Sequence, residues 1–486
     1  MTESTQTPLA GLWKPVHLSH LYYGSNSAQK HLLDCLPSSS SKAFIITGSS
    51  LATKTSLISS LENQLGARHA GTFSNIKQHA PIAQLDEATE LVLRDDNIDT
   101  IISVGGGSPI DSAKAISYRV NEKSGKFLFH IAIPTTLSAA ECTLNAGYTN
   151  KDGMKTGVAS PELAPHVIIY DSSFALETPP RLWLSTGMRA MDHAMELMYH
   201  PTSIEMPCRQ MALFAAGELF RNLPKYKEDP KKEDVITRLQ LASYASLGFL
   251  GLNVKGALGL SHTLGYALGS PYGIPHGITS CLTLGHVVKL KAENPEDAKQ
   301  IARMVPFIGL SSSGDDKKDA MAVGDAILEL VDSLGLKTKL GDHGVEKDQT
   351  RVITKTATKQ EEGPLYDKVM DLVNGLWSSF HASRHVAILK RQSLQTGLLW
   401  RNMFDEDQDP KSALFRKRPT YERLGSGADT DGIELQEVRE YVLPDPGVCN
   451  PVIERTVEAR HVLEAGIARN IISGPDQTRS MRFSYE

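Results

Sequence analysis

Three histidines in two segments of the chain are the residues whose types and spacing point most directly to chemistry. His193 lies in the segment TGMRAMDHAME, and His262 and His276 lie further along the chain in SHTLGYALGSPYGIPHG. Neutral imidazole is a common ligand of zinc and iron. Arg189 precedes His193 by one helical turn, on the same face of the expected helix. A carboxylate there would complete a divalent site, whereas a guanidinium cannot coordinate a cation and repels it.

Arg189 therefore separates two interpretations of this cluster. In the first, which we favour, no metal is bound, and Arg189 or a protonated histidine stabilises negative charge on a carbonyl oxygen, or Arg189 binds a substrate carboxylate through two hydrogen bonds. In the second, Fe or Zn is held by His193, His262 and His276, since three imidazoles hold zinc in other proteins. Asp192 is not expected to replace the missing carboxylate, because it lies about 100° around the helix from His193. A further alternative is that these residues have a structural role only, as hydrogen-bonded polar groups at a domain interface.

A glycine loop offers a second candidate site. An apolar strand runs into Gly105, Gly106 and Gly107, and a helix begins near Ser108 and continues through Asp111. Glycines allow backbone N–H groups to approach an anion closely, and the start of a helix adds unpaired donors. The loop does not match GxGxxG, and a plain turn between strand and helix is the alternative.

Two further strand ends are expected beside this loop. Gly48 and Ser49 follow the first strand, and Thr135 and Thr136 follow the strand after the glycine loop. The carboxyl ends of parallel strands share one edge of the sheet, which is where open α/β sheets bind ligands. The three segments are therefore predicted to form one cofactor site.

The rest of the pattern predicts the scaffold that positions these loops. Short apolar runs alternate with amphipathic stretches up to about residue 171, which is typical of repeated strand and helix units. After Pro179 and Pro180, helical patterns replace the strands. We predict an α/β domain with a mainly parallel sheet over residues 1–180 and an all-α domain over residues 181–378. Residues 379–486 form a C-terminal extension without an assigned role.

Composition limits the classes of partner. The 486 residues include 51 basic and 56 acidic side chains, a net charge of -5, so neither nucleic acid nor an anionic membrane is expected. The uncharged stretch from Leu241 to Val254 is too short for a membrane span and predicts a buried helix. Five scattered cysteines and the lack of a leader pattern favour a reducing, cytoplasmic setting. The expected partner is a small carbonyl or keto-acid substrate, and the oligomer considered is a homodimer.

Several of these segments, in their order, resemble the iron-dependent alcohol dehydrogenase superfamily. They are GGGSPIDSAK, PTTLSAAE, KTGVASPELAPHVIIYD, TGMRAMDHAME and SHTLGYALG followed by IPHG, and the resemblance covers about residues 15–378. Such proteins pair a nicotinamide-cofactor domain with a helical domain, and the substrate lies between them. The resemblance thus implies NADPH or NADH, bound by residues at the three strand ends: Gly48, Ser49, Gly105, Gly106, Gly107, Ser108, Asp111, Thr135 and Thr136.

At two places the sequence departs from the metal-dependent members and resembles the maleylacetate reductase branch of this superfamily. The interval from Pro134 to Glu141 is one residue shorter than in PTTxGTGSE of metal-dependent members, and Arg189 stands where their metal-ligand aspartate is expected. The branch is described as working without metal. Tyr266 stands where relatives often carry a histidine of a proton relay. Gly48 replaces the acid that would hold a ribose 2′-hydroxyl, which favours NADPH over NADH.

The resemblance implies an oxidoreductase that acts on CH–OH or on conjugated C=C and C=O groups. Its substrate would be a small carbonyl compound or a keto or enoyl carboxylic acid, and its catalytic residues would be Arg189, His193, His262, His276 and Tyr266. A metal-dependent alcohol dehydrogenase and a non-catalytic relative are the alternatives.

Overall fold

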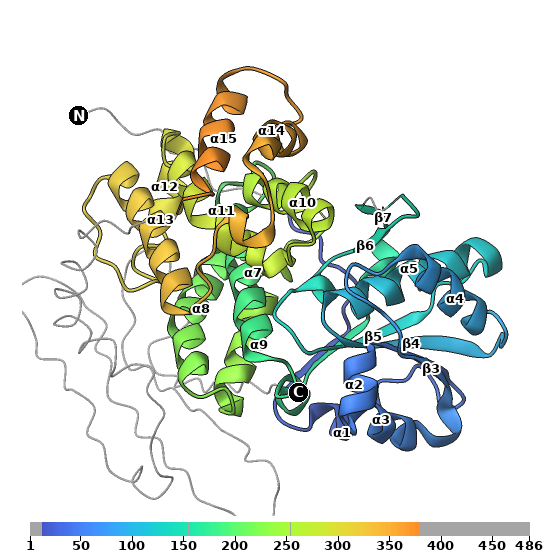
Figure 1. Cartoon of the computed structure of the whole chain (residues 1–486). Helices are drawn as coiled ribbons and strands as arrows, with labels where there is room; N and C mark the ends of the chain where they lie inside the picture. Colours follow the sequence, from blue (N-terminus) through green and yellow to red (C-terminus); the bar gives the residue numbers. More distant parts are fainter. Residues whose placement is uncertain (1–11, 153–154, 253, 379–486) are drawn as a thin grey trace, which may run out of the picture. The chain divides into compact units, whose positions relative to one another are not determined.

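A six-stranded, wholly parallel sheet forms the N-terminal half of the protein (Figure 1). The computed structural model describes residues 12–152, 155–252 and 254–378, so the predicted extension over 379–486 lies outside the described residues. The strands are β1 (His20–Tyr23), β2 (Lys42–Thr47), β3 (His69–Phe73), β4 (Ile98–Gly105), β5 (Phe129–Pro134) and β8 (Val167–Tyr170). Their order is β1-β8-β5-β4-β2-β3. The predicted α/β class is confirmed.

Helices cover both faces of this sheet, which explains why its central strands are continuous apolar runs. Ile45 and Ile102 pack on one face against α1 (Ser27–His31) and α3 (Leu57–Leu65). Phe44 and Ile101 pack on the other face against α4 (Ile82–Val92) and α5 (Gly107–Ser124). The alternation along each strand therefore divides its side chains between two separate cores.

The strand order contains one reversal that matters for binding. The chain runs outward from β2 to β3 and then returns to the other side of β2 with β4. In open α/β sheets, ligands bind at the carboxyl edge where the order reverses in this way. The glycine loop after β4 and the segment Gly48–Ser49 after β2 lie at that edge.

Two features of the α/β half differ from the sequence-based prediction. The short edge strand β1 was not expected, and neither was the antiparallel hairpin of β6 (Asn145–Thr149) and β7 (Lys155–Ala159). Both consist of strands of four or five residues with polar side chains among the apolar ones, so their patterns do not stand out from loops.

Long helices make up the second half, as predicted (Figure 1). They are α7 (Pro180–Tyr199), α8 (Gln210–Glu228), α9 (Glu233–Leu247), α10 (Leu260–Tyr272), α11 (His276–Lys291), α12 (Pro295–Ala302), α13 (Asp316–Ser333), α14 (Thr350–Thr358) and α15 (Pro364–Gly375). The prediction of one helix from Leu241 to Val254 is wrong beyond Leu247, because the chain turns at Gly248 and takes a positive φ of 68° at Gly251. Of the helices in the described ranges, none is long and apolar enough to cross a membrane.

A buried loop after β5 joins the two halves. The backbone N–H of Leu137 donates to Thr186 Oγ1 of α7 at 3.1 Å, and Leu137 O accepts from Ser243 Oγ of α9 at 3.1 Å. Both backbone polar groups of Leu137 are thus bonded to helices of the second half. Because Thr135 and Thr136 precede Leu137 in the same loop, the position of the predicted cofactor residues depends on the helices.

Candidate active site

The glycine loop begins where β4 ends. Gly105 has φ of +140°, a conformation that L side chains rarely adopt. Its carbonyl accepts a 2.9 Å hydrogen bond from the backbone N–H of Thr135, which ties this loop to the one after β5. A Cβ atom on Gly106 would lie 3.0 Å from Thr136 Cγ2, so a larger residue there would crowd the loop after β5.

The structure brings the predicted cofactor residues to one edge of the sheet. Gly48 and Ser49 follow β2, Gly105 to Ser108 follow β4, and Thr135 and Thr136 follow β5. Asp111 instead has a structural contact, because Oδ2 accepts a hydrogen bond from the N–H of Gly147 at 3.1 Å. Asp111 also lies 3.7 Å from Nζ of the buried Lys114. Asp111 therefore holds the hairpin of β6 and β7 beside the glycine loop.

The second part of the site lies on α7. Arg189, Asp192, His193 and Glu196 are all buried there. Arg189 Nη1 donates to Ser280 Oγ at 3.3 Å and lies 3.4 Å from Asp192 Oδ2. The guanidinium is only 7 % exposed, so its charge is balanced inside the protein by Asp192.

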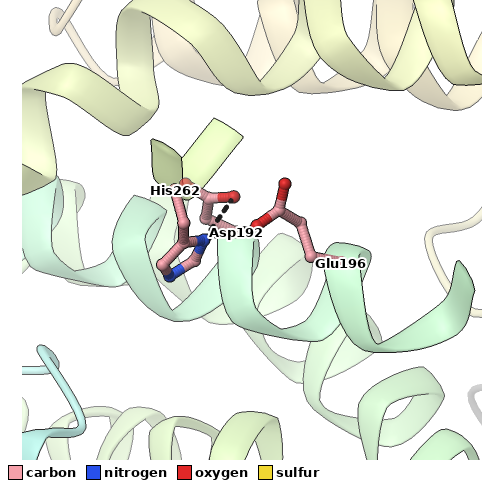
Figure 2. Close-up of side chains that lie close together, drawn as sticks. All are labelled: Asp192, Glu196 and His262. Atoms are coloured by element: carbon pink, nitrogen blue, oxygen red, sulfur yellow. Dashed lines mark hydrogen bonds and ion pairs between the residues drawn. The ribbon is translucent and has the colours of Figure 1, made fainter. Parts of the chain in front are cut away.

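Two carboxylates on α7 organise the residues that reach them from α10 and α11 (Figure 2). Asp192 Oδ2 accepts from Ser261 Oγ at 2.9 Å and from Ser280 Oγ at 2.6 Å. Glu196 accepts from the backbone N–H of Ser261 at 2.7 Å and shares a 2.5 Å hydrogen bond with His262 Nδ1. Figure 2 shows both carboxylates pointing toward the His262 ring. They therefore fix the orientation of that ring.

Burial and charge act in opposite directions within this network. Burial lowers the pKa of His262 and Arg189 adds to this effect, but Asp192 and Glu196 outweigh both and raise it above its ordinary value. Burial would raise the pKa of Asp192, but His262 and Arg189 hold it well below its usual range. Burial raises the pKa of Glu196. Asp192 therefore carries the negative charge, and Glu196 and His262 share one proton.

His193 and His262 lie side by side, with ring centroids 5.0 Å apart. Burial, followed by the charges of His262 and Arg189, holds the pKa of His193 well below its ordinary value, so this ring is neutral. Within the described part of the chain, His193 Nδ1 and His262 Nε2 are buried without a hydrogen-bond partner. Unpaired buried nitrogens of this kind are costly unless a ligand satisfies them.

His276 belongs to a different part of the site. It is the first residue of α11, and its ring contacts those of His79 at 5.5 Å and Tyr266 at 6.0 Å, both edge to face. Among the described residues, the group with ligand atoms all within 4.8 Å of one another is Asp192, Glu196 and His262, not the three predicted histidines. Tyr266 is 44 % exposed. The roles predicted for these side chains stay predictions.

Sequence reasoning missed four residues of this arrangement, namely His79, Glu196, Ser261 and Ser280. It considered Asp192 and set it aside. The four-residue spacing of Asp192 and Glu196 places them on one face of a helix and was a usable signal. The two serines and His79 gave no comparable signal, because their partners come from other elements.

Comparison with known proteins agrees with this fold. The model of the iron-containing alcohol dehydrogenase family matches residues 19–172, and the model of the C-terminal domain of the same family matches residues 183–370. The chain belongs to the iron-containing alcohol dehydrogenase family. It is an oxidoreductase of that family, and maleylacetate reductases are among the proteins to which it is similar.

Maleylacetate reductases are among the relatives of this chain. That of Sphingobium indicum is 29 % identical over 290 residues, which cover 58 % of this chain and 74 % of the relative. That of Rhizobium sp. strain MTP-10005 is 33 % identical over 214 residues, which cover 43 % of this chain and 57 % of the relative. The crystal structure of the Rhizobium enzyme matches 76 % of this chain and 99 % of its own, with a TM-score of 0.62 and 23 % identity.

A further solved structure is similar in fold. The sulfoacetaldehyde reductase of Bifidobacterium kashiwanohense, solved in complex with NAD⁺, covers 76 % of this chain and 100 % of its own, with a TM-score of 0.66 and 21 % identity.

Proposed function

We propose that this protein is an NADPH- or NADH-dependent reductase that acts without a metal on a small carbonyl compound bearing a carboxylate, a keto or enoyl acid. The observation that carries the proposal is the buried guanidinium of Arg189 among the site histidines. The two maleylacetate reductase relatives support the same class of substrate.

Arg189 has N–H groups that its contacts with Asp192 and Ser280 do not use. Among the described residues, its hydrogen bonds to Asp192 and Ser280 both come from Nη1. Guanidinium carries five N–H groups in a planar fork that matches a carboxylate. The groups on Nη2 and Nε are thus the ones that would hold a substrate carboxylate or the oxygen of the reacting carbonyl.

The donor set does not fit the divalent cation that the family name implies. Asp192 Oδ2 already accepts from the hydroxyls of Ser261 and Ser280, and Glu196 is bonded to the N–H of Ser261 and the imidazole of His262. The single negative charge of Asp192 already balances Arg189. A dication placed here would be close to a fixed positive charge and would break these hydrogen bonds, so both Coulomb repulsion and lost hydrogen bonding oppose it.

The reaction needs one hydride and one proton. A reduced nicotinamide held by the glycine loop would supply the hydride for the carbonyl carbon, so that the electron pair of the C=O bond would move to the oxygen. Arg189 would stabilise the negative charge that develops there, in the way of an oxyanion hole. His262, held by Asp192 and Glu196, would donate the proton to that oxygen from Nε2. His276 and Tyr266 would line the remaining side of the substrate.

A screen of cofactor oxidation tests the proposal. Wild type, Arg189→Ala and Arg189→Lys are assayed with NADPH and NADH against keto acids and neutral aldehydes. We expect Arg189→Ala to lower kcat/KM for keto acids by about 100-fold or more, since a lost buried charge-assisted contact is worth roughly 3 kcal/mol. Arg189→Lys keeps the charge but loses the fork and is expected to recover only part of this loss.

The outcomes separate three classes of protein. A loss confined to acids identifies Arg189 as the carboxylate contact, and an equal loss on both substrate classes identifies it as the oxyanion donor. Stoichiometric metal whose removal abolishes turnover would show a metal-dependent alcohol dehydrogenase instead. If neither cofactor raises the melting temperature or changes its fluorescence with the pure protein, the chain is a non-catalytic relative.

A further inference from the structure

The loop between β3 and α4 holds two adjacent residues in an unusual backbone conformation. His79 has φ of 64° and Ala80 has φ of 45°. Among the non-glycine residues of the described part of the chain, they are the only neighbours in sequence that both have a positive φ. Side chains disfavour this region, so the surrounding structure must hold the loop in place. Backbone strain of this kind is concentrated at functional sites.

Contacts of the backbone show what holds the loop. The N–H of His79 donates to Ser108 Oγ at 3.1 Å, and Ser108 belongs to the glycine loop. The carbonyl of His79 accepts from both the N–H and the Oγ1 of Thr149, each at 3.1 Å. The main chain at His79 is therefore bonded to the predicted cofactor loop on one side and to the hairpin strand β6 on the other.

The side chain of His79 reaches the other half of the protein. Its ring meets the ring of His276 edge to face, with centroids 5.5 Å apart and an angle of 87° between the planes. His276 is the first residue of α11, and its ring also contacts the ring of Tyr266. Edge-to-face pairs at this separation have a preferred geometry, so one ring restricts the rotation of the other.

We propose that His79 is a further positioning residue of the active site. Its backbone N–H sets the position of Ser108 in the cofactor loop, while its imidazole sets the ring of His276 at the substrate. One residue thus fixes the distance between the two parts of the reaction centre. This inference rests on the proposed function, because it takes the glycine loop to bind the nicotinamide cofactor and His276 to face the substrate.

The two roles of His79 can be separated by substitution. His79→Asn removes the imidazole but keeps the backbone contact, and asparagine tolerates a positive φ. In His79→Asn we expect kcat to fall by about tenfold or more, because small displacements of reacting groups are costly. We expect KM for NADPH to change by less than about twofold, because the backbone contact to Ser108 is kept. His79→Phe keeps an aromatic ring against His276 and is expected to recover most of kcat. Ser108→Ala removes the acceptor of the His79 N–H and is expected to raise KM for NADPH with a smaller change in kcat.

Gln78→Asn is the matched control, since Gln78 is the exposed neighbour of His79 in the same loop. Unchanged kcat in His79→Asn, or equal loss in His79→Asn and His79→Phe, would overturn the inference. Crystal structures add a readout independent of turnover: a His276 ring in the same orientation in wild type and His79→Asn would also overturn it. Failure of the proposed function itself would appear separately, as a wild-type protein that binds no nicotinamide cofactor.

Discussion

At the scale of single residues, the positive charge in the site comes from a side chain, the guanidinium of Arg189. Arg189 lies one turn before His193, and Asp192 at the next turn of α7 balances it. A guanidinium remains charged at every relevant pH. The site therefore carries a permanent positive charge in a fixed place.

The charge at residue 189 predicts the metal content of variants. In Arg189→Asp the repulsion disappears and a carboxylate stands one turn before His193, so we expect zinc per chain to rise severalfold over wild type in protein produced with added zinc. Inductively coupled plasma mass spectrometry measures it. Arg189→Asn, which removes the cation without adding a carboxylate, serves as the control. Equal metal content in wild type and Arg189→Asp would contradict this account.

At the scale of elements, the site depends on how closely α7 approaches the start of α10. Gly259 immediately precedes α10, and a Cβ atom there would overlap the carboxyl group of Glu196. Since Glu196 bonds to both Ser261 and His262, this one glycine allows the contact that orients the His262 ring.

The substitution Gly259→Ala tests that packing. Overpacking at a buried contact costs about 1–3 kcal/mol, so we expect the free energy of unfolding to fall by that amount in urea titrations. We also expect kcat to fall, because Glu196 must move away from His262. Gly375→Ala in α15 is the control, since nothing lies within 4 Å of a Cβ atom there. A Gly259→Ala protein as stable and active as wild type would show that Glu196 does not need its observed position.

A second element-scale prediction concerns pH and the edge of the sheet. His166, just before β8, stacks on His17 and Phe129 and accepts a hydrogen bond from the N–H of His130. Burial, with a smaller contribution from His17, lowers the pKa of His166 from 6.5 to about 4. Between these two pH values the unfolded chain binds a proton that the folded chain does not, so the free energy of unfolding falls as pH decreases from 6.5 to about 4.

Replacing His166 should reduce this pH dependence. We expect the difference in free energy of unfolding between pH 7.5 and pH 5 to be smaller in His166→Gln than in wild type, since glutamine can still accept from His130 but does not titrate. Chemical denaturation at the two pH values measures it. His20→Gln, at an exposed histidine of β1, should leave the difference unchanged. If the difference in free energy of unfolding is the same in His166→Gln and wild type, a group other than His166 causes the pH dependence.

At the scale of the whole molecule, the two halves are coupled through the loop at Leu137. Thr186→Val keeps the side-chain volume but leaves the buried N–H of Leu137 without its acceptor, which costs about 1–3 kcal/mol. We expect that loss of stability together with a higher KM for the cofactor, because the same loop carries Thr135 and Thr136. Urea titration and steady-state kinetics give the two values. Thr237→Val, at a half-buried threonine of α9 bonded within its own helix, is the control and should leave KM unchanged.

Most of the scaffold was predictable because its signals are local. Runs such as Ile101 to Val104 are mainly apolar and end in glycines, and the loss of strands after Pro180 is visible in the pattern. The turn at Gly248 was missed because apolar residues continue through it. Strand β1 is short and carries polar residues, and only its pairing with β8 makes it a strand.

The site was less predictable because its decisive contacts join distant segments. Arg189 and the histidines were found from their spacing along the chain. Asp192 was set aside from its angle to His193 on the helix, yet its partners Ser261 and Ser280 arrive from α10 and α11. The positive φ of His79 arises from hydrogen bonds to Ser108 and Thr149, which no local pattern encodes.

The pairing of β1 with β8 has a consequence for how the protein is made. Residues His20 to Tyr23 find their strand partner in Val167 to Tyr170. The ribosome adds roughly 5–20 residues per second, so on the order of ten seconds pass between the synthesis of β1 and that of β8. During this interval residues 20–23 lack their strand partner, and the sheet closes on that side only after the rest of the α/β half has been translated.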